Sequence, residues 1–366
     1  MGKWRGTLEN MGIKKNFWKN KRVFITGHTG FKGSWLAIWL KEMGANICGY
    51  ALKPDSKSYF FYKANVEMGL NNIYGNILNF KKLSEAIKIF KPEIAFHLAA
   101  QPLVPKGFDD PRTTYNTNIQ GTVNFLDALR ECKSIKTIII VTTDKVYKNN
   151  ERSISFKETN ELGGFDPYSS SKACSELITN AYRSSFFEKK NIGVATARAG
   201  NVIGGGDCSS NRLVPDIFKS VEFNTKLKIR DKNNIRPWQH VLEALRGYIV
   251  LAQSLYFDKT LSEPWNFGPK QKDCKKVEWI ISKFKKRFNF DFSVEKRNKI
   301  HESSVLKLDT SKSKDKLNWE PILSINDAVN LTSDWYIKKF DGHTQDKIAI
   351  EQIYDYEKKV VDNYYG

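Results

Sequence analysis

The sequence predicts an α/β protein in which a doubly wound parallel β-sheet is followed by a smaller mixed α/β lobe. Three observations support this fold class. Short apolar segments alternate with segments of helical periodicity up to about residue 203, a glycine-rich turn directly follows the first apolar segment, and beyond residue 204 the chain becomes irregular and richer in Pro, Gly and Asn. Strands that alternate with helices at this spacing are typical of a parallel sheet with helices on both faces.

The predicted strands are short, apolar and rich in β-branched residues, as buried parallel strands are. In chain order they cover residues 22–26, 46–52, 94–98, 137–142, 193–198 and 264–268. The predicted helices have apolar residues three or four positions apart. They cover residues 34–43, 83–90, 116–130, 169–187, 275–287, 325–340 and 348–363. In such a sheet, ligands bind at the carboxyl ends of the strands, where Thr26, Ala99 and Thr143 lie.

The bulk composition excludes several classes of protein. The chain of 366 residues has a net charge of +19, but its lysines are spread out and no nucleic-acid recognition motif accompanies them, so we expect no nucleic-acid partner. No apolar run approaches the roughly 20 residues that span a bilayer, so we expect no membrane segment. Residues 1–20 are too polar for a secretory signal. Five scattered cysteines predict reduced thiols, a cytoplasmic location and no metal site.

A glycine-rich loop with the spacing GxxGxxG follows the first predicted strand and opens the first helix. Its glycines allow a tight turn in which a dinucleotide pyrophosphate lies on the helix N-terminus, so the loop predicts a Rossmann-type cofactor site. The candidate cofactor-binding residues of this loop are Gly27, Thr29, Gly30, Phe31 and Gly33.

The residues alone leave the choice between NAD and NADP open. Dinucleotide-binding loops usually have an acidic residue about 20 positions further on, which binds the ribose 2′-hydroxyl. This chain has Tyr50-Ala-Leu-Lys53 there, and Lys53 is compatible with a 2′-phosphate. Asn76, between Gly75 and Ile77, is placed to contact the adenine amino group or, alternatively, is a turn residue.

Tyr168 and Lys172 form a candidate proton-transfer pair. Their spacing places both side chains on one face of a helix, where the lysine ammonium would lower the pKa of the tyrosine towards neutrality. Thr143, at a predicted strand end, supplies a hydroxyl that completes such a site. The next two residues, Asp144 and Lys145, are an acid and a base that a simple alcohol dehydrogenase does not need.

Together these motifs resemble the extended short-chain dehydrogenase/reductases. The resemblance covers most of residues 20–340 and rests on the glycine loop, His97-Leu-Ala-Ala-Gln101, Asn118, the Thr-Asp pair, the Tyr/Lys pair and Arg198-Ala-Gly-Asn201. Further segments are similar to the bacterial CDP-glucose 4,6-dehydratases. They are TGHTGFKGSW at 26–35, QPLV at 101–104, TTDK at 142–145, GGGD at 204–207, RPWQH at 236–240, and His301-Glu302 followed by LKLD at 306–309.

The resemblance implies a reaction, a cofactor and an assembly. In that reaction CDP-D-glucose loses water to give CDP-4-keto-6-deoxy-D-glucose, an early step towards deoxysugars of surface polysaccharides, and the cofactor is NAD. The resemblance also implies a homodimer built on a four-helix bundle, which by position uses the helices at 116–130 and 169–187.

The resemblance also assigns binding residues. It places Leu98, Ala99, Ala100 and Asn118, with Tyr168 and Lys172, beside the cofactor. The expected substrate-binding residues are Gln101, Asn201, Arg212, Arg236 and His301. The two arginines are the expected partners of the pyrophosphate or ribose, because a guanidinium matches phosphate geometry. His28 and His240 are further candidates near phosphate or cofactor, although isolated histidines are often structural.

On this basis the chain divides into four parts. Residues 1–20 form an N-terminal extension, and residues 21–203, to which residues 241–266 return, form the NAD-binding Rossmann domain. Residues 204–240 and 267–340 form the sugar-nucleotide-binding lobe. Residues 341–366 form a helical tail on the surface.

The expected mechanism gives the site two duties. Tyr168, as phenolate, takes the O4 proton while hydride leaves C4, Thr143 orients O4, and Lys172 stabilises the phenolate. The 4-ketone acidifies the proton on C5, and elimination of water across C5 and C6 then needs a base and an acid. Asp144 is the expected acid, which requires burial to keep it protonated near neutrality. Hydride return to C6 makes the overall reaction redox-neutral.

Lys145 departs from the wider pattern, because related sugar-nucleotide dehydratases have Glu at this position as the base. A lysine is a base only as the neutral amine, which requires a pKa lowered by burial or by neighbouring cations. We expect Lys145 to be the base for the C5 proton. The alternative is that Lys145 stabilises the enolate while water or another residue takes the proton.

Other functions are weighed against this one. A nucleotide-sugar C4 epimerase needs the Tyr/Lys pair but no acid and base for elimination, so Asp144 and Lys145 argue against it. A dehydratase for a GDP- or UDP-linked hexose is closer, because the residues that recognise the base lie in the second lobe. A non-catalytic scaffold of the same fold would not need the intact Thr, Tyr and Lys set.

Overall fold

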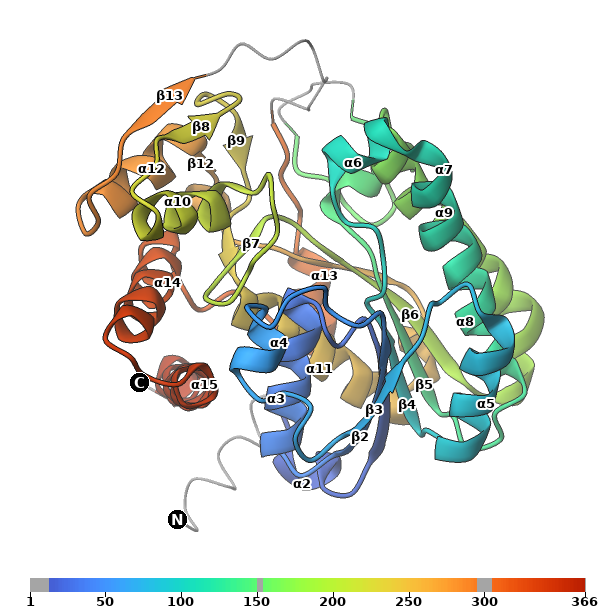
Figure 1. The fold of residues 1–366 in the computed structure, drawn as a ribbon. Coiled ribbons are helices and arrows are strands. Elements are labelled where there is room, and N and C mark those ends of the chain that lie inside the picture. The colour runs from blue at the N-terminus through green and yellow to red at the C-terminus, as the bar shows by residue number, and fades with distance from the viewer. Residues whose placement is uncertain (1–12, 150–153, 295–304, 366) are drawn as a thin grey trace.

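The computed structural model describes residues 13–149, 154–294 and 305–365, and its centre is a seven-stranded sheet (Figure 1). The strands are β1 (Arg22–Thr26), β2 (Asn46–Ala51), β3 (Asn71–Tyr74), β4 (Ile94–His97), β5 (Thr137–Val141), β6 (Gly193–Ala199) and β11 (Pro264–Phe267). Their order across the sheet is β11-β6-β5-β4-β1-β2-β3, and every neighbouring pair is parallel. This doubly wound arrangement confirms the predicted fold class.

Helices cover both faces of the sheet (Figure 1). One face carries α3 (Phe31–Glu42) and α11 (Val241–Phe257), and the other carries α5 (Phe80–Phe90), α8 (Gly121–Arg130) and α9 (Pro167–Tyr182). The strand order reverses between β1 and β4, so the carboxyl ends of these two strands open the crevice in which doubly wound proteins bind ligands.

The later part of the chain adds a second group of elements at one end of the sheet, which we call the second lobe (Figure 1). Its helices are α10 (Leu213–Glu222), α12 (Val277–Lys285) and α14 (Ile325–Phe340). Its strands form three small sheets: β7 (Val202–Ile203) with β10 (Gln239–His240), β9 (Ile235–Arg236) with β12 (Lys275–Lys276), and β8 (Leu227–Ile229) with β13 (Phe292–Val294).

Shorter elements connect these parts. They are α2 (Lys15–Trp18), α4 (Phe60–Lys63), α6 (Val104–Asp109), α7 (Pro111–Tyr115) and α13 (Ser311–Leu317), π-helical turns at Asn116–Gln120 and Arg183–Phe187, and 3₁₀ turns at Asp144–Val146, Glu188–Lys190, Lys259–Leu261 and Gln271–Asp273.

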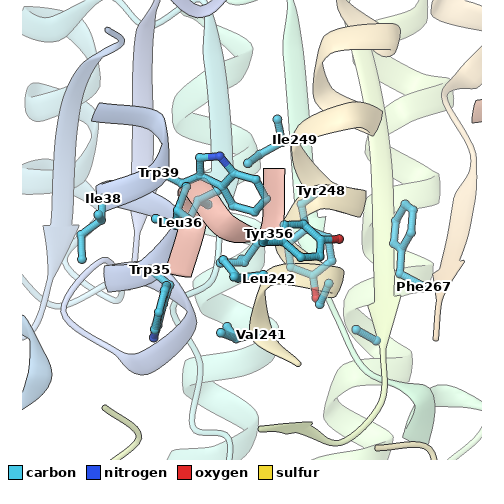
Figure 2. Packing of buried hydrophobic residues seen from close by; sticks show 14 of the residues in the cluster. Trp35, Leu36, Ile38, Trp39, Val241, Leu242, Tyr248, Ile249, Phe267 and Tyr356 are labelled. Atoms are coloured by element: carbon cyan, nitrogen blue, oxygen red, sulfur yellow. The ribbon is translucent and has the colours of Figure 1, made fainter. Parts of the chain in front are cut away.

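The larger core lies on the face of the sheet that carries α3 and α11 (Figure 2). Trp39 and Tyr248 are fully buried there, and Tyr356 of the C-terminal helix α15 (Gln345–Tyr365) meets the Trp39 ring edge-on, with 5.8 Å between the ring centroids. The Trp39 indole also donates a hydrogen bond of 2.9 Å to Glu357. Each large apolar side chain buried in this way contributes about 1.5–3 kcal/mol, so α15 stabilises the domain.

Two parts of the sheet layer differ from the prediction. The sequence-based prediction does not include strand β3. Its polar segment Asn71-Asn72, at the edge of the sheet, does not have the apolar pattern of a buried strand. The helix predicted over 116–130 is a π-helical turn followed by α8, and it continues directly from the short helix α7. The Asp110 side chain caps α7 by accepting from the Thr113 amide, a π-helical turn follows, and α8 continues the helix.

Candidate active site

A cavity of about 480 Å³ lies between the carboxyl ends of the strands and the second lobe. The structure brings seven of the predicted site residues together in its wall: Thr143, Asp144, Lys145, Tyr168, Asn201, Arg212 and Arg236. The first four come from β5 and α9 on the sheet side, and the last three come from the segment after β6 and from the second lobe.

The start of α9 fixes the Tyr/Lys pair. The Asp166 carboxylate caps this helix, since its Oδ1 accepts from the amides of Tyr168 (2.9 Å) and Ser169 (3.0 Å). Tyr168 is therefore in the first turn, and it is buried. Lys172 follows one turn later, and its Nζ donates to the carbonyl of Val141 at 3.2 Å. Because Val141 ends β5, the ammonium is held at the strand end that leads to Thr143.

Burial shifts the pKa values of both members of this pair. Burial raises the pKa of Tyr168 to about 12, although a hydrogen bond to Thr143 and the charge of Arg212 oppose the rise. Burial also lowers the pKa of Lys172 to about 8, against the opposite effect of Glu176. Burial outweighs the groups that lower the pKa of Tyr168 in the protein alone, and a lowering towards neutrality by Lys172 stays a prediction.

The Thr-Asp-Lys motif forms a short 3₁₀ turn at the end of β5. The Thr143 hydroxyl donates to Asp144 Oδ1 at 3.0 Å and accepts from the Lys145 amide at 3.4 Å. Asp144 is 2% exposed, and its second oxygen, Oδ2, is buried and has no hydrogen-bond partner among the described residues. A buried polar atom without a partner is costly and is expected to have one when a ligand is bound.

The glycine loop fits a dinucleotide. Gly27 has a positive φ of 74°, and a Cβ atom there would lie 2.7 Å from the Ala99 amide nitrogen. A Cβ atom on Gly33 would lie 2.7 Å from the Cα of His28, and Gly30 precedes α3 without a side-chain cap. The glycines therefore allow the backbone of the loop to pack closely. The first amide groups of α3, a 12-residue helix, are not capped by a side chain, and helix N-termini of this kind bind a pyrophosphate.

The other predicted cofactor residues surround this loop. Leu98 and Ala99 follow β4, and both amides donate to the Thr26 hydroxyl at 3.2 Å. The Thr29 hydroxyl donates to the Leu52 carbonyl at the end of β2. Asn76 is exposed after β3, and its side-chain oxygen accepts from the Leu78 amide, as in a turn. Phe31 and Ala100 are partly buried beside these segments.

Asn118 and Gln101 are joined to each other. The Asn118 side chain accepts from the Gln101 amide at 2.8 Å and donates to the Gln101 carbonyl and to Ser171 of α9. The Gln101 side chain donates to Thr114 and to the Leu103 carbonyl and accepts from the Leu103 amide. These contacts shape the loop at 102–105, which lines the cavity.

The second lobe contributes cationic groups. Arg212 pairs with Asp207 at 3.2 Å and is about one third exposed, whereas Arg236 is 4% exposed in the cavity wall. Asn201 follows β6, and its carbonyl accepts from the Gln239 amide. His301 lies outside the described residues.

Lys32, inside the glycine loop, also lines the cavity and is absent from the sequence-based prediction. Its Nζ donates to the Tyr248 hydroxyl at 3.4 Å. Burial, with the cations Arg212 and Lys172 nearby, lowers the pKa of Lys32 to about 7. Its position between Gly30 and Gly33 in the cofactor loop is the sequence feature that could have identified Lys32 as a site residue. The convergence of these cations favours an anionic ligand in the cavity.

The two candidate histidines are fully buried and contact neighbouring elements of the fold. His28 is fully buried, its Nε2 hydrogen-bonds Asn72 at 2.6 Å, and its ring packs where a Cβ atom on Gly49 would otherwise lie. Burial lowers the pKa of His28 to about 4. His240 is also buried and accepts from the Leu242 amide at the start of α11, so it caps a helix.

The described part of the chain has neither a metal cluster nor a membrane-spanning helix. Within residues 13–149, 154–294 and 305–365, no group of three His, Cys, Asp or Glu side chains is placed to hold a metal ion. Over the same ranges, no helix combines the length and the apolar composition that crossing a bilayer requires. All five cysteines are unpaired thiols.

A glycine loop on a doubly wound sheet, with a Thr after β5 and a Tyr/Lys pair at the start of α9, defines a short-chain dehydrogenase/reductase. A family model for GDP-mannose 4,6 dehydratases matches residues 24–332, and the chain belongs to this family. CDP-glucose 4,6-dehydratase of Salmonella typhimurium is 45% identical over 352 residues, which cover 94% of this chain and 98% of that protein. The resemblance inferred from the motifs is thereby confirmed.

Solved structures agree on the fold. An epimerase from Methanothermobacter thermautotrophicus superposes with a TM-score of 0.77 at 20% identity, covering 90% of this chain and 96% of that one. The dTDP-glucose 4,6-dehydratase of Bacillus anthracis, solved with NAD, gives a TM-score of 0.71 at 22% identity, with 88% and 98% covered. At these identities the likeness establishes the architecture.

Proposed function

We propose that this protein converts CDP-D-glucose to CDP-4-keto-6-deoxy-D-glucose with NAD as its cofactor, and so is a hydro-lyase. The observation that carries the proposal is the buried, unpartnered Oδ2 of Asp144 in the wall of the cavity that also contains Thr143 and Tyr168. Oxidation at C4 needs only the hydroxyl and the phenol, whereas a carboxyl beside them suits the departure of a hydroxyl group. The Salmonella relative supports the choice of sugar nucleotide.

The first step is proton removal from O4. Tyr168 takes this proton, and Thr143 orients O4 by a hydrogen bond. Because burial raises the pKa of Tyr168 to about 12, the phenolate depends on positive charge from Lys172, Arg212 and the cofactor. When bound, NAD would be held by the loop that contains Gly27 and Gly33, and it would supply a hydride acceptor for C4 and a hydride donor for C6.

The second step removes water across C5 and C6. Asp144 donates a proton to the departing 6-hydroxyl through Oδ2, while Thr143 holds Oδ1 at 3.0 Å. Lys145, next along the turn and half-buried in the cavity wall, takes the proton from C5. The adjacent positions of acid and base on one turn suit an elimination in which both groups act on neighbouring carbon atoms.

The second lobe binds the nucleotide part. Arg212 and Arg236 present guanidinium groups to the cavity, and a planar guanidinium suits the oxygens of a diphosphate. Asn201 also lines the cavity and is proposed to contact the diphosphate. Gln101 is proposed to affect substrate binding indirectly, because its hydrogen bonds to Leu103 hold the cavity-lining segment 102–105 in place.

The assembly is proposed to be a homodimer that works in the cytoplasm, in the synthesis of deoxysugars for surface polysaccharides. The dimer would form through the helices predicted at 116–130 and 169–187. Leu177 is 59% exposed and Phe186 is 36% exposed along this region, and exposed apolar side chains of this kind often mark interfaces. A Leu177→Glu variant should elute as a monomer in size-exclusion chromatography with light scattering. A dimer of unchanged stability in that variant contradicts the proposed interface.

The function is tested by incubation with CDP-, GDP-, UDP- and dTDP-hexoses, each with NAD⁺ or NADP⁺. We expect a 4-keto product with the mass of one water lost, from CDP-glucose with NAD⁺. A product that has gained a new C4 configuration without loss of water would instead identify an epimerase. Dehydration of another nucleotide sugar alone would correct the substrate.

A further inference from the structure

A buried ion pair lies beside the active site. Glu176 of α9 and Arg198 of β6 are 4% and 2% exposed, and two hydrogen bonds of 2.9 Å join Nε and Nη2 of the arginine to the two carboxylate oxygens. The carboxylate also accepts from the hydroxyls of Thr142 (2.5 Å) and Thr196 (2.6 Å). Burial alone would raise the pKa of Glu176, but Arg198 and the two hydroxyls outweigh it and lower the pKa, so the group is a carboxylate.

The two members of this pair hold opposite ends of the catalytic segment, residues 142–147, which carries the Thr-Asp-Lys motif. At its start, the Thr142 hydroxyl donates to Glu176. At its end, the Tyr147 hydroxyl accepts from Arg198 Nη1 at 2.8 Å. The segment is therefore fastened at both ends to one ion pair.

The same carboxylate belongs to the helix that carries the Tyr/Lys pair. Glu176 follows Lys172 by four residues and Tyr168 by eight, so the three side chains lie on one face of α9. Lys172 Nζ donates to the Val141 carbonyl, which directly precedes the catalytic segment. A movement of the ion pair would therefore shift the helix relative to the strand end.

We propose that the Glu176–Arg198 pair is the positioning element that keeps the catalytic segment aligned with Tyr168 and Lys172. The inference rests on the proposed dehydratase function, because that function assigns roles to both groups of residues. Stability alone is a weak explanation, since a buried ion pair often contributes no more than apolar side chains of similar volume. What the pair adds is a fixed geometry, and a misplacement of about 1 Å can cost about 100-fold in rate.

The first test replaces Glu176 by glutamine, which keeps the shape and removes the charge. We expect kcat to fall about 100-fold while KM for CDP-glucose changes little. We also expect faster amide hydrogen exchange in residues 142–147 of the protein without substrate. The matched control is Glu243→Gln, in the pair that Glu243 forms with Arg246 on α11, where both side chains are fully buried. This variant should lose stability but keep kcat and keep slow exchange in the catalytic segment.

Two further variants separate position from stability. Tyr147→Phe leaves the Glu176–Arg198 pair intact, keeps the stacking on Phe156 at 4.9 Å between ring centroids, and removes the hydroxyl that accepts from Arg198 and donates to Asn266 at 2.7 Å. We expect roughly a tenfold loss of kcat, with solvent exchange at C5 reduced more than NADH formation, because Tyr147 adjoins the elimination residues. In Glu176→Gln with Arg198→Met no charge stays buried, so stability should recover while kcat stays low.

Recovery of kcat together with stability in the double variant overturns the positioning role, as does wild-type kcat in both Glu176→Gln and Tyr147→Phe. Unchanged exchange in residues 142–147 of Glu176→Gln also overturns it. A wild-type protein that forms no 4-keto product from CDP-glucose contradicts the proposed function instead. The exchange measurement needs no substrate, so it reports on the ion pair in that case too.

Discussion

Replacement of Asp144 by asparagine tests the elimination step most selectively. The asparagine keeps the volume of the side chain and can still accept the Thr143 hydrogen bond now made to Oδ1 at 3.0 Å. Oδ2 accepts no hydrogen bond from the described part of the chain, so the exchange breaks none there and should change stability little. The loss falls on proton donation to the 6-hydroxyl, and a positioned general acid supplies about 10²–10⁴-fold. The barrier of that step should rise by about 3–5 kcal/mol.

The assay follows NADH absorbance and the 4-keto product in parallel. In Asp144→Asn, oxidation at C4 continues, so NADH should accumulate transiently while product formation falls by the factor above. Tyr168→Phe is the contrasting variant, because it blocks the first step and should give neither NADH nor product. A turnover of Asp144→Asn within about tenfold of wild type, or a loss of NADH formation equal to the loss of product, would refute the assignment of Asp144 as the acid.

Three further outcomes are expected. Gly33→Ala should weaken NAD binding strongly in a fluorescence titration, because its Cβ atom would lie 2.7 Å from the Cα of His28, and unchanged affinity would rule out the cradle. Burial lowers the pKa values of His28 and His97 to about 4 and about 3, so below pH 6.5 the unfolded chain binds protons that the folded chain does not. The free energy of unfolding should therefore decrease as the pH is lowered below 6.5, by up to about 3 kcal/mol for His28. A melting temperature that stays constant from about pH 7 to about pH 4 would contradict this. Arg236→Lys should raise KM for CDP-glucose about tenfold or more while kcat changes less, since an ammonium loses the fork geometry, and an unchanged KM would exclude a diphosphate contact.

The sequence predicts most of the sheet because its central strands are apolar and their neighbours in space follow from the doubly wound order. It misses β3, whose residues Asn71 and Asn72 are polar and whose pairing with β2 depends on a neighbour distant in sequence. The position of the catalytic turn after β5 is predictable as well, because strand ends and active sites coincide in this fold.

The site is less predictable where a side chain depends on several elements at once. His28 lies in the glycine loop but points into the core, because Gly49 on the neighbouring strand leaves room for its ring. The spacing of Glu176 from Lys172 is visible in the sequence, but its partners on β5 and β6 appear only when the sheet is assembled. The pKa of Tyr168 is raised by burial, and burial cannot be inferred from the spacing between Tyr168 and Lys172 in the sequence.

Conversion of CDP-glucose labelled with deuterium at C4 tests the central claim most directly. The product, analysed by mass spectrometry and NMR, should have lost one water and should contain the deuterium at C6, because the same cofactor takes the hydride from C4 and returns it. Loss of the label to solvent, or its retention at C4 of a sugar that keeps its water, would contradict a redox-neutral dehydration by Tyr168, Asp144 and Lys145.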